Sequence, residues 1–286
     1  MLTTFAIRAG CAVFQTLPER QALRLGRGLG LLWYHAVRYR RAHVRRSLSL
    51  AFHDLTSHEL RALTRANFVH YGQVLAETAR LPLLVPASLA RHVEFTGSER
   101  FEEARARGRG VVLISGHYGN WDLLAVAQAL AGYEIHVVTR RLHSRGADRA
   151  WQEMRRAQGV RFLPDHGSSR DILRLLRAGK TVGLILDQHV GGRRGVPVRF
   201  LGRPAWTARA AAVLAARTGC AVLPVFNCRG DGRYHVEFGP EIPLAVGRDA
   251  AETELLTTQR YSDVLEAFIR RHPEQWLWAH RRWKEG

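Results

Sequence analysis

Lysine, cysteine and long apolar runs are all scarce in this sequence of 286 residues. Of its 43 lysines and arginines, only Lys180 and Lys284 are lysines. Its three cysteines, Cys11, Cys220 and Cys228, form no CxxC pair, which favours reduced structural thiols over a disulfide framework. The longest stretches without a charged residue are about eleven residues, well short of the ~18 that a transmembrane helix needs.

A secretory signal is not expected either, because Arg8 interrupts the N-terminal apolar stretch and no small-residue cleavage site follows. We therefore expect a protein that is soluble or lies on a membrane without crossing it. What the sequence has in excess is positive charge, with 25 acidic residues leaving a formal net charge of +18. An arginine-rich surface binds phosphate and carboxylate groups. The expected partners are thus anionic: nucleic acid, an anionic membrane face or an acidic protein.

The sequence divides into two predicted parts. Residues 1–90 are expected to form a helical, membrane-associating region, beginning with an amphipathic helix over residues 2–17. Capping boxes are predicted at Thr16–Glu19 and Thr56–Glu59, where each would open a helix. The arginine-rich run Arg38–Arg46 lies between them. The N-terminal helix has two interpretations: it lies on a bilayer, or it packs on the rest of the protein.

Residues 91–286 are predicted to form an α/β domain, because short apolar runs alternate with amphipathic segments. The fold class is thus α/β, with a central, mostly parallel sheet flanked by helices. The expected strands are 93–96, 111–115, 135–139, 161–163, 182–187, 221–226 and 234–238. The expected helices are 98–107, 120–131, 145–158, 169–178, 207–218 and 252–271. The stretch Gln188–Trp206, rich in glycine, proline and arginine, is expected to be an irregular loop.

The most informative segment is Ser115-Gly-His-Tyr-Gly-Asn-Trp-Asp122, which follows a buried strand. Ligands of open α/β sheets bind at the carboxyl ends of strands. Here His117 stands at such an end, and Asp122 follows in the first turn of the next helix. If the carboxylate holds one ring N–H, the other ring nitrogen is free to act as a base on a substrate hydroxyl. The alternative is that His117 is a hydrogen-bonded loop residue. Asp122 would then be an acidic residue at a helix start, where the helix dipole favours negative charge.

This segment resembles the HxxxxD motif of the glycerolipid acyltransferases. The wider chain resembles the late acyltransferases of lipid A biosynthesis, which add lauroyl or myristoyl chains, and their phosphatidylinositol mannoside relatives. The resemblance takes in five blocks in order: 47–52, 107–122, 187–204, 218–226 and 273–283.

The resemblance implies roles for individual residues. His117 would be the general base, and Asp122 would orient it and stabilise the imidazolium. The second family block would fall at 138–141 and end in an arginine, with Arg140 facing the site. The oxyanion of the tetrahedral intermediate would be held near Gly119 and Asn120. The substrate-binding residues would be Asp187, at the end of its predicted strand, and five residues after it: Gln188, Arg193, Arg194, Arg199 and Arg203.

Several of these residues have a second interpretation. Asp187 would be costly to bury unpaired, so it either pairs with an arginine or orients the loop. The loop arginines are phosphate-binding groups or solvated charge. Trp276, Trp278 and Trp283 are interpreted as core or membrane-interface packing, His189 as an ordinary loop residue and His280 as structural. No metal-ligand spacing, P-loop or dinucleotide fingerprint is present, so neither a metal nor another cofactor is expected.

Together these features predict a membrane-associated O-acyltransferase on the cytoplasmic face of a bacterial inner membrane, bound peripherally or monotopically. The acyl donor would be a thioester on acyl carrier protein or coenzyme A, and the acceptor a hydroxyl of a lipid or glycolipid. Acidic carrier protein, acyl-CoA and anionic lipid all suit a surface of charge +18. One alternative is a lipid or thioester hydrolase that uses the same residues on water. A nucleic-acid-binding protein would explain the charge, but the sequence has no recognition motif for one.

Overall fold

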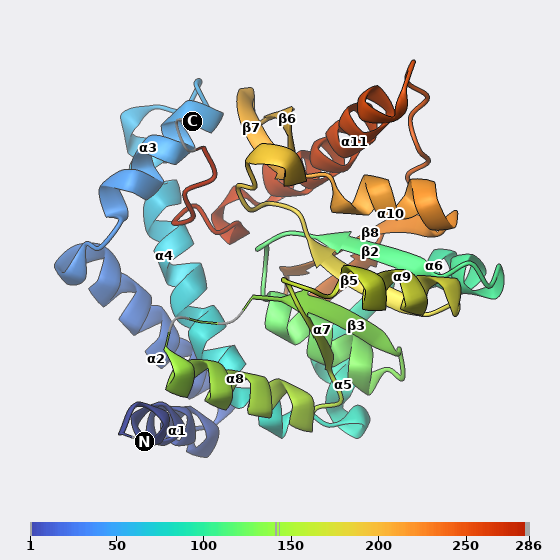
Figure 1. Ribbon diagram of the computed structural model, residues 1–286. Coiled ribbons are helices and arrows are strands. Elements are labelled where there is room, and N and C mark those ends of the chain that lie inside the picture. The colour runs from blue at the N-terminus through green and yellow to red at the C-terminus, as the bar shows by residue number, and fades with distance from the viewer. Residues whose placement is uncertain (1, 141, 143, 284–286) are drawn as a thin grey trace.

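The computed structural model describes residues 2–140, 142 and 144–283, and its N-terminal part is helical, as expected. The helices of this part are α1 (Leu2–Thr16), α2 (Glu19–Leu32), α3 (Arg41–Ala51), α4 (Ser57–Arg80) and α5 (Pro86–His92), with a π-helical turn η1 (Trp33–Val37) after α2 and a short 3₁₀ turn η2 (Leu81–Leu83) after α4. Figure 1 shows α1 to α4 in blue to cyan along one side of the molecule, and α5 below the sheet. No helix of the described residues is long and apolar enough to span a membrane.

One of the two predicted capping boxes is confirmed. At the start of α4 the Thr56 hydroxyl accepts the Glu59 N–H, and the Glu59 carboxylate accepts the Thr56 N–H at 2.8 Å. The prediction at Thr16 is wrong, because α1 continues through Thr16 and the Thr16 hydroxyl donates back to the Val13 carbonyl. The N-cap of α2 is Pro18, which makes no side-chain cap.

Helices α2 and α4 cross with their backbones in contact. A Cβ atom on Gly72 would lie 2.2 Å from the carbonyl oxygen of Gly26, and one on Gly30 would lie 2.4 Å from the carbonyl oxygen of Phe68. Only glycine fits at such a crossing, as in small-residue helix interfaces. This packing fixes α2 against α4, which in turn contacts the α/β body.

A seven-stranded sheet forms the body, in the order β1-β9-β8-β2-β5-β3-β4. All neighbouring strands are parallel except β8 and β9. The strands are β1 (Val93–Thr96), β2 (Val111–Ser115), β3 (Ile135–Thr139), β4 (Arg161–Pro164), β5 (Thr181–Ile185), β8 (Ala221–Arg229) and β9 (Tyr234–Phe238). The predicted mostly parallel α/β fold is therefore confirmed.

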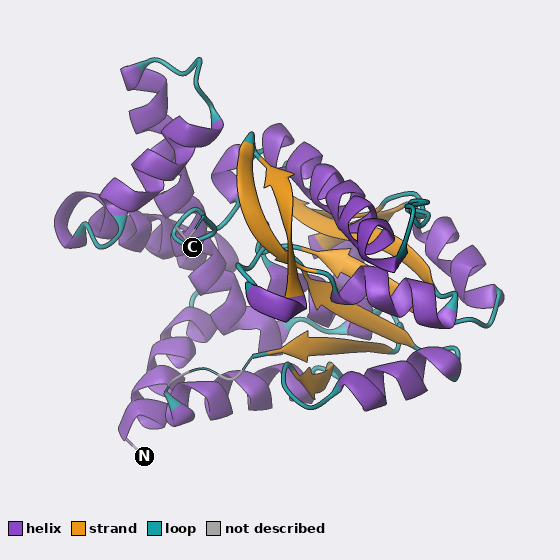
Figure 2. Cartoon of the chain, turned by 45° about the horizontal axis from the view of Figure 1, so that its top comes forward, coloured by secondary structure: helices purple, strands orange, loops and turns teal. Residues whose placement is uncertain are grey.

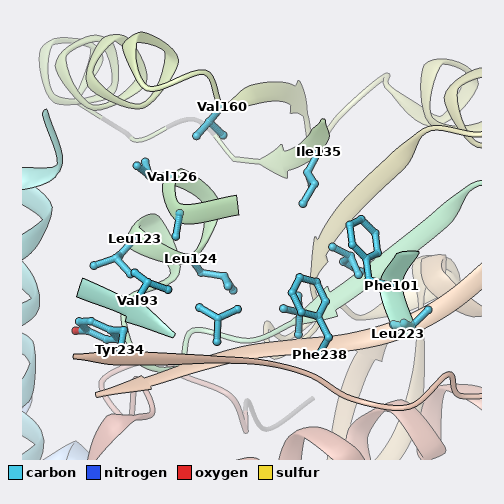
Figure 3. Packing of buried hydrophobic residues seen from close by; sticks show 14 of the residues in the cluster. Val93, Phe101, Leu123, Leu124, Val126, Ile135, Val160, Leu223, Tyr234 and Phe238 are labelled. Atoms are coloured by element: carbon cyan, nitrogen blue, oxygen red, sulfur yellow. The ribbon is translucent and has the colours of Figure 1, made fainter. Parts of the chain in front are cut away.

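Helices cover both faces of this sheet (Figure 2). They are α6 (Ser98–Ala106), α7 (Trp121–Leu130), α8 (Arg145–Ala157), α9 (Ser169–Arg177), α10 (Ala210–Thr218) and α11 (Ala250–Arg271). Strand β2 is buried on both sides, so alternate residues enter different cores. Val111 and Leu113 join the cluster under α6 and α7 (Figure 3), whereas Val112 and Ile114 join the one under α9, α10 and α11. This central position fixes the carboxyl end of β2 rigidly.

The stretch Gln188–Trp206 corrects an expectation, since most of it is regular. It contains a 3₁₀ turn, η3 (Gly192–Arg194), and an antiparallel hairpin of β6 (Gly195–Phe200) and β7 (Arg203–Ala208). Leu201 and Gly202 join the strands with φ values of 49° and 77°, the positive pair of a tight hairpin turn. Each strand of this hairpin pairs with one neighbour, as an edge strand does. A proline, which has no backbone N–H to donate, is tolerated in such a strand. The predicted helix at 207–218 starts later, at Ala210, because Thr207 and Ala208 belong to β7.

Candidate active site

The turn between β2 and α7 presents His117 at the carboxyl end of a central strand. Two glycines allow this turn. A Cβ on Gly116 would lie 2.8 Å from Leu265 and 3.1 Å from the carboxylate of Asp187. Gly119 has φ of 61°, and a Cβ there would lie 2.0 Å from the carbonyl oxygen of Asn227. The chain therefore passes close to neighbouring groups and turns back at once into α7.

Asp187 is the carboxylate that holds His117. Its Oδ1 lies 2.7 Å from Nδ1 of the imidazole, and its Oδ2 accepts the backbone N–H of His117 at 2.6 Å. The indole N–H of Trp276 donates to the same Oδ2 at 2.8 Å. Burial would raise the pKa of Asp187, but the charge of His117 and these hydrogen bonds hold it well below its usual range. Asp187 is thus ionised although it is 1% exposed.

The imidazole of His117 is arranged as a base. Burial favours its neutral form, yet the charge and hydrogen bond of Asp187 outweigh burial and raise the pKa of His117. With Nδ1–H directed at Asp187, the lone pair of Nε2 is available for a proton. The side chain is 18% exposed and lies beside the rings of Trp121 and His280, whose centroids are 4.9 and 6.4 Å away. A substrate hydroxyl can therefore reach it.

Asp122 lies in the first turn of α7, as predicted, but its carboxylate bonds helix α8. Its carboxylate accepts the indole N–H of Trp151 at 2.9 Å and a guanidinium N–H of Arg155 at 3.1 Å, both from α8. The prediction that Asp122 holds the ring of His117 is wrong, since Asp187 occupies that position. The pKa of Asp122 is raised by burial, an effect that Arg155 opposes. A catalytic contribution of Asp122 stays a prediction.

Hydrogen bonds of Asn120 and Gly119 hold the turn between β2 and α7 in place. The Asn120 side chain caps α7 by accepting the Leu123 N–H at 3.0 Å and donates to Glu77 at 3.3 Å. The Gly119 N–H donates to the carbonyl of Gln275. One N–H of the Asn120 amide is therefore engaged by Glu77, and a role of Asn120 or Gly119 at the oxyanion stays a prediction. In the first turn of α7, Trp121 and Asp122 carry N–H groups with no helical carbonyl before them, and these point outward at the positive end of the helix.

The predicted arginines lie on other elements than His117, namely after strand β3 and along the β6–β7 hairpin. Arg140 is exposed and follows β3, with β5 standing between β3 and β2; Arg141 lies outside the described residues. Arg193 and Arg194 are exposed in η3. Arg199 and Arg203 lie near the tip of the hairpin, where the backbone of Arg199 bonds Gln259 of α11. The structure thus brings Asp187 to His117 but gives none of these arginines a contact with the imidazole.

The C-terminal segment is the part of the site that sequence reasoning missed. The Leu277 N–H donates to the carbonyl of His117 at 3.0 Å. On the other side, the Tyr71 hydroxyl of α4 reaches the carbonyls of His117 and Gln275 at 3.2 and 3.0 Å. In Figure 1 this segment, in red, passes close to α4. The interpretation of Trp276 as core packing is confirmed by its 1% exposure, although its indole N–H also serves Asp187.

Arg282, in the same C-terminal segment, bonds the first and last residues of the stretch Gln188–Trp206. Its guanidinium is 1% exposed overall and donates to the carbonyls of Trp206 and Gln188 at 2.7 and 3.3 Å, and also to the Thr207 hydroxyl. Burial lowers the pKa of Arg282 to about 10, against the opposing charge of Asp187. The arginine that lies near Asp187 is therefore Arg282. Gln188 is held through its backbone, which fixes the chain directly after Asp187.

The whole chain matches a known family. Residues 1–285 fit the model of the bacterial lipid A biosynthesis acyltransferases. The chain belongs to this family. It is 28% identical over 272 residues to the lipid A biosynthesis lauroyltransferase of Escherichia coli (strain K12), which covers 94% of this chain and 87% of the relative.

Two other relatives carry different names. The phosphatidylinositol mannoside acyltransferase of Mycobacterium tuberculosis (strain H37Rv) is 29% identical over 225 residues, 76% of this chain and 69% of the relative. The lipid A biosynthesis palmitoleoyltransferase of Escherichia coli (strain K12) is 24% identical over 272 residues, 94% and 86%. The resemblance given by the sequence motifs is thus confirmed, and this member of the lipid A biosynthesis acyltransferase family is an acyltransferase that acts on a lipid or glycolipid acceptor.

Within the described residues, no three His, Cys, Asp or Glu side chains gather as a metal site. The donor set beside His117 is a carboxylate, an indole N–H and backbone groups, which suits proton transfer.

Proposed function

We propose that the protein transfers a fatty acyl chain from an acyl thioester to a hydroxyl of a lipid or glycolipid acceptor, with His117 as general base and Asp187 as its orienting carboxylate. The observation that carries this proposal is the 2.7 Å contact between His117 Nδ1 and the ionised Asp187 at the carboxyl end of β2. The names of the relatives support both substrates: one is a lauroyltransferase, and another acts on a phosphatidylinositol mannoside.

The reaction requires no covalent enzyme intermediate. Nε2 of His117 takes the proton of the acceptor hydroxyl as its oxygen attacks the thioester carbonyl carbon. The negative charge that develops on the carbonyl oxygen is stabilised by the N–H groups of Trp121 and Asp122 at the start of α7. When the intermediate collapses, the C–S bond breaks and the thiolate recovers the proton from the imidazolium. The products are an ester and a free thiol.

The positive surface supports a phosphate-bearing or acidic donor. Coenzyme A carries phosphates, and acyl carrier protein is acidic, so either suits a protein of net charge +18. The alternative, hydrolysis of the same thioester by water, differs in its dependence on acceptor. The experiment is to measure thiol release from acyl-carrier protein and acyl-CoA with and without glycolipid acceptor. Release that requires the acceptor, with one ester formed per thiol, supports the transferase; equal release without acceptor supports the hydrolase.

Attachment to the cytoplasmic face of the inner membrane is proposed through the N-terminal helices. Exposed apolar side chains lie along α1, α2 and η1, at Val13, Leu25, Leu32 and Val37, and the basic run Arg38–Arg46 follows. An apolar face beside basic residues binds anionic lipid surfaces. Part of α1 also packs on the protein, since Arg80 of α4 donates to the carbonyls of Phe14 and Leu17 at 2.6 Å. The end of α1 therefore packs on α4 through Phe14, while Val13 beside it stays exposed to a lipid surface.

We expect the variant Arg45→Gln/Arg46→Gln to bind vesicles containing phosphatidylglycerol roughly thirtyfold more weakly, since each basic residue near the surface contributes about 1 kcal/mol. Both arginines are exposed on α3. The matched control is Arg177→Gln/Arg217→Gln, which removes the same charge from α9 and α10 on the other side of the molecule (Figure 1). Co-sedimentation at increasing salt is the measurement. Equal losses in both variants, or binding that ignores lipid charge, would contradict the proposal.

The arginines of η3 are proposed to bind a phosphate of the donor or of the acceptor headgroup. Arg193 and Arg194 are exposed on the segment that leaves Asp187, and Arg194 lies 3.5 Å from the ring of His166. We expect Arg193→Gln/Arg194→Gln to raise KM much more than it lowers kcat, because phosphate binding acts on ground and transition states alike. Steady-state kinetics beside Arg177→Gln/Arg217→Gln provides the test. A fall in kcat at constant KM would refute this role.

A further inference from the structure

Two buried side chains hold backbone carbonyls of the turn between β2 and α7. The ring Nε2 of His70, in α4, lies 3.2 Å from the carbonyl oxygen of Gly119. The side-chain amide of Asn227, in β8, donates to the carbonyl of Asn120 at 2.8 Å. His70 is 4% exposed and Asn227 is 0% exposed. Two elements that are far apart in the sequence therefore meet at this turn.

The chemistry of both side chains makes them donors. A carbonyl only accepts, so Nε2 of His70 must carry a hydrogen. Burial and the charge of Arg229 lower the pKa of His70 to about 3, so the ring is neutral near neutral pH. In Asn227 the amide nitrogen faces the Asn120 carbonyl, because the amide oxygen would be repelled there. That oxygen lies toward Gly119 and has no hydrogen-bond partner among the described residues.

A held carbonyl also fixes the N–H of the residue that follows it. The peptide bonds of this turn are trans, and in a planar trans peptide the C=O and the next N–H point in opposite directions. The bond from His70 therefore sets the direction of the Asn120 N–H, and the bond from Asn227 sets that of the Trp121 N–H. Neither N–H has an acceptor among the described residues. The two bonds thus orient the peptide groups that lead into the first turn of α7.

These bonds act where the backbone has few other restraints. Gly119 has a φ of 61°, in the left-handed region, and a glycine leaves that region as readily as it enters. The bond from His70 opposes such a change. The Asn120 carbonyl also accepts the Leu124 N–H at 2.9 Å, as the first bond of α7, and Asn227 adds a second donor from the sheet. The start of α7 is therefore fixed by groups outside the helix.

We propose that His70 and Asn227 are positioning residues for acyl transfer: they hold the peptide groups before α7 so that the first N–H groups of this helix meet the negative charge on the thioester carbonyl oxygen. Both side chains are buried, so they act through the backbone and not on the substrate. This inference rests on the proposed function, because the oxyanion arises only in that reaction. Donors aimed in advance at a developing charge act on the transition state, and hence on kcat.

The first test removes one donor at a time and uses the thioester that the wild type accepts. His70→Leu and Asn227→Ala should each lower kcat by about 10²-fold, the effect of a small misplacement in an active site, with KM nearly unchanged. His70→Gln should recover most of the rate, because its amide N–H can take the place of the Nε2–H. The matched control is Thr64→Val, a buried residue of α4 whose hydroxyl bonds the carbonyl of Leu60 in its own helix at 2.6 Å. It should turn over as the wild type does.

A sulfur-substituted substrate separates this role from a general loss of structure. In a dithioester the carbonyl oxygen is replaced by sulfur, a weaker hydrogen-bond acceptor. An enzyme that stabilises the oxyanion with N–H donors should therefore turn over the thioester faster than the dithioester. We expect the ratio of the two rates to shrink severalfold in His70→Leu and Asn227→Ala, and to keep its wild-type value in Thr64→Val. A loosened fold would lower both rates alike and leave the ratio unchanged.

The orientation of the peptide groups can also be measured without activity. In full-length protein labelled with ¹⁵N-tryptophan, the backbone amide signal of Trp121 is assigned by its loss in Trp121→Phe. This signal should shift in Asn227→Ala, because the carbonyl of the same peptide group loses its donor. Tryptophan amides outside the turn and the C-terminal segment serve as the reference. An unmoved Trp121 amide in a folded Asn227→Ala protein would overturn the proposal.

The outcomes keep this inference apart from the proposed function. Wild-type kcat in folded His70→Leu and Asn227→Ala, no recovery in His70→Gln, or an unchanged ratio of thioester to dithioester rates would each refute it. Thermal unfolding shows which variants fold; if one does not, the other decides, because the two residues come from separate elements. If the wild type shows no acyl transfer, the proposed function fails, yet the Trp121 amide still reports whether Asn227 orients this peptide group.

Discussion

Replacing His117 by alanine is expected to lower acyl transfer by about 10²–10⁴-fold, the contribution of a positioned general base. The structure gives the reason: Nε2 is the free nitrogen of a ring whose Nδ1 is fixed by Asp187 at 2.7 Å. Alanine leaves no group to take the acceptor proton. The loss should appear in kcat, with KM for the thioester nearly unchanged, because substrate contacts outside the reacting centre remain. The rate of ester formation at saturating acceptor is the measurement.

The control for this variant is His117→Gln, which offers Asp187 an N–H donor but no base. Alanine leaves the buried Asp187 with two donors, the backbone N–H of His117 and the indole of Trp276. Thermal unfolding of both variants then separates lost stability from lost chemistry. Two folded variants that are equally inactive support the mechanism, whereas near-normal turnover by either would refute it.

Replacing Asp187 by asparagine is expected to cost about 10³–10⁴-fold in kcat, as loss of the orienting carboxylate does in the serine-protease triad. The carboxylate accepts from the ring and backbone of His117 and from Trp276. An amide has one acceptor oxygen, so its NH₂ group must face a donor or force the ring into the other tautomer. The imidazolium formed during the reaction also loses its counter-charge.

Single-turnover transfer by Asp187→Asn, compared with the wild type and with Asp187→Glu, measures this cost. We expect the glutamate variant to recover part of the rate, because it restores the charge at a shifted distance. An asparagine variant with wild-type kcat would show that the 2.7 Å contact has no part in the chemistry.

The sheet could be predicted from the sequence because its strands are short, apolar and separated by amphipathic helices. Strands β2 and β9 begin and end as predicted, and helix α4 begins at its predicted capping box. His117 could also be predicted, since a histidine between two glycines directly after a buried strand has few structural reasons to be there. These features depend on local spacing, which the sequence displays directly.

The partner of His117 could not be predicted from local spacing. Asp122 is five residues away and was the natural choice, whereas Asp187 is 70 residues away and meets His117 because β5 is the neighbour of β2 in the sheet. The order of strands is a property of tertiary packing. One signal was available: Asp187 follows the apolar strand β5 closely, and a buried carboxylate there requires a partner.

The hairpin β6–β7 could not be predicted from the sequence for a different reason. Glycine, proline and arginine dominate its sequence, so the alternation of Val198 and Phe200 toward the core was obscured. Its strands are stabilised by α11, where Gln259 bonds both backbone groups of Arg199 and Glu266 accepts the Leu201 N–H. Such contacts between distant segments override the local propensities.

The pH dependence of kcat/KM tests the pairing of His117 with Asp187 most directly. The charge of Asp187 raises the pKa of His117, and a protonated imidazole cannot accept the acceptor proton, so activity must fall as the pH drops through that pKa. The other groups that face the ring, Asp122 and His280, are the same in the wild type and in Asp187→Asn. The account predicts that the acidic limb of the profile moves to lower pH in Asp187→Asn, because the raising charge is gone. An acidic limb at the same pH in both proteins would contradict it.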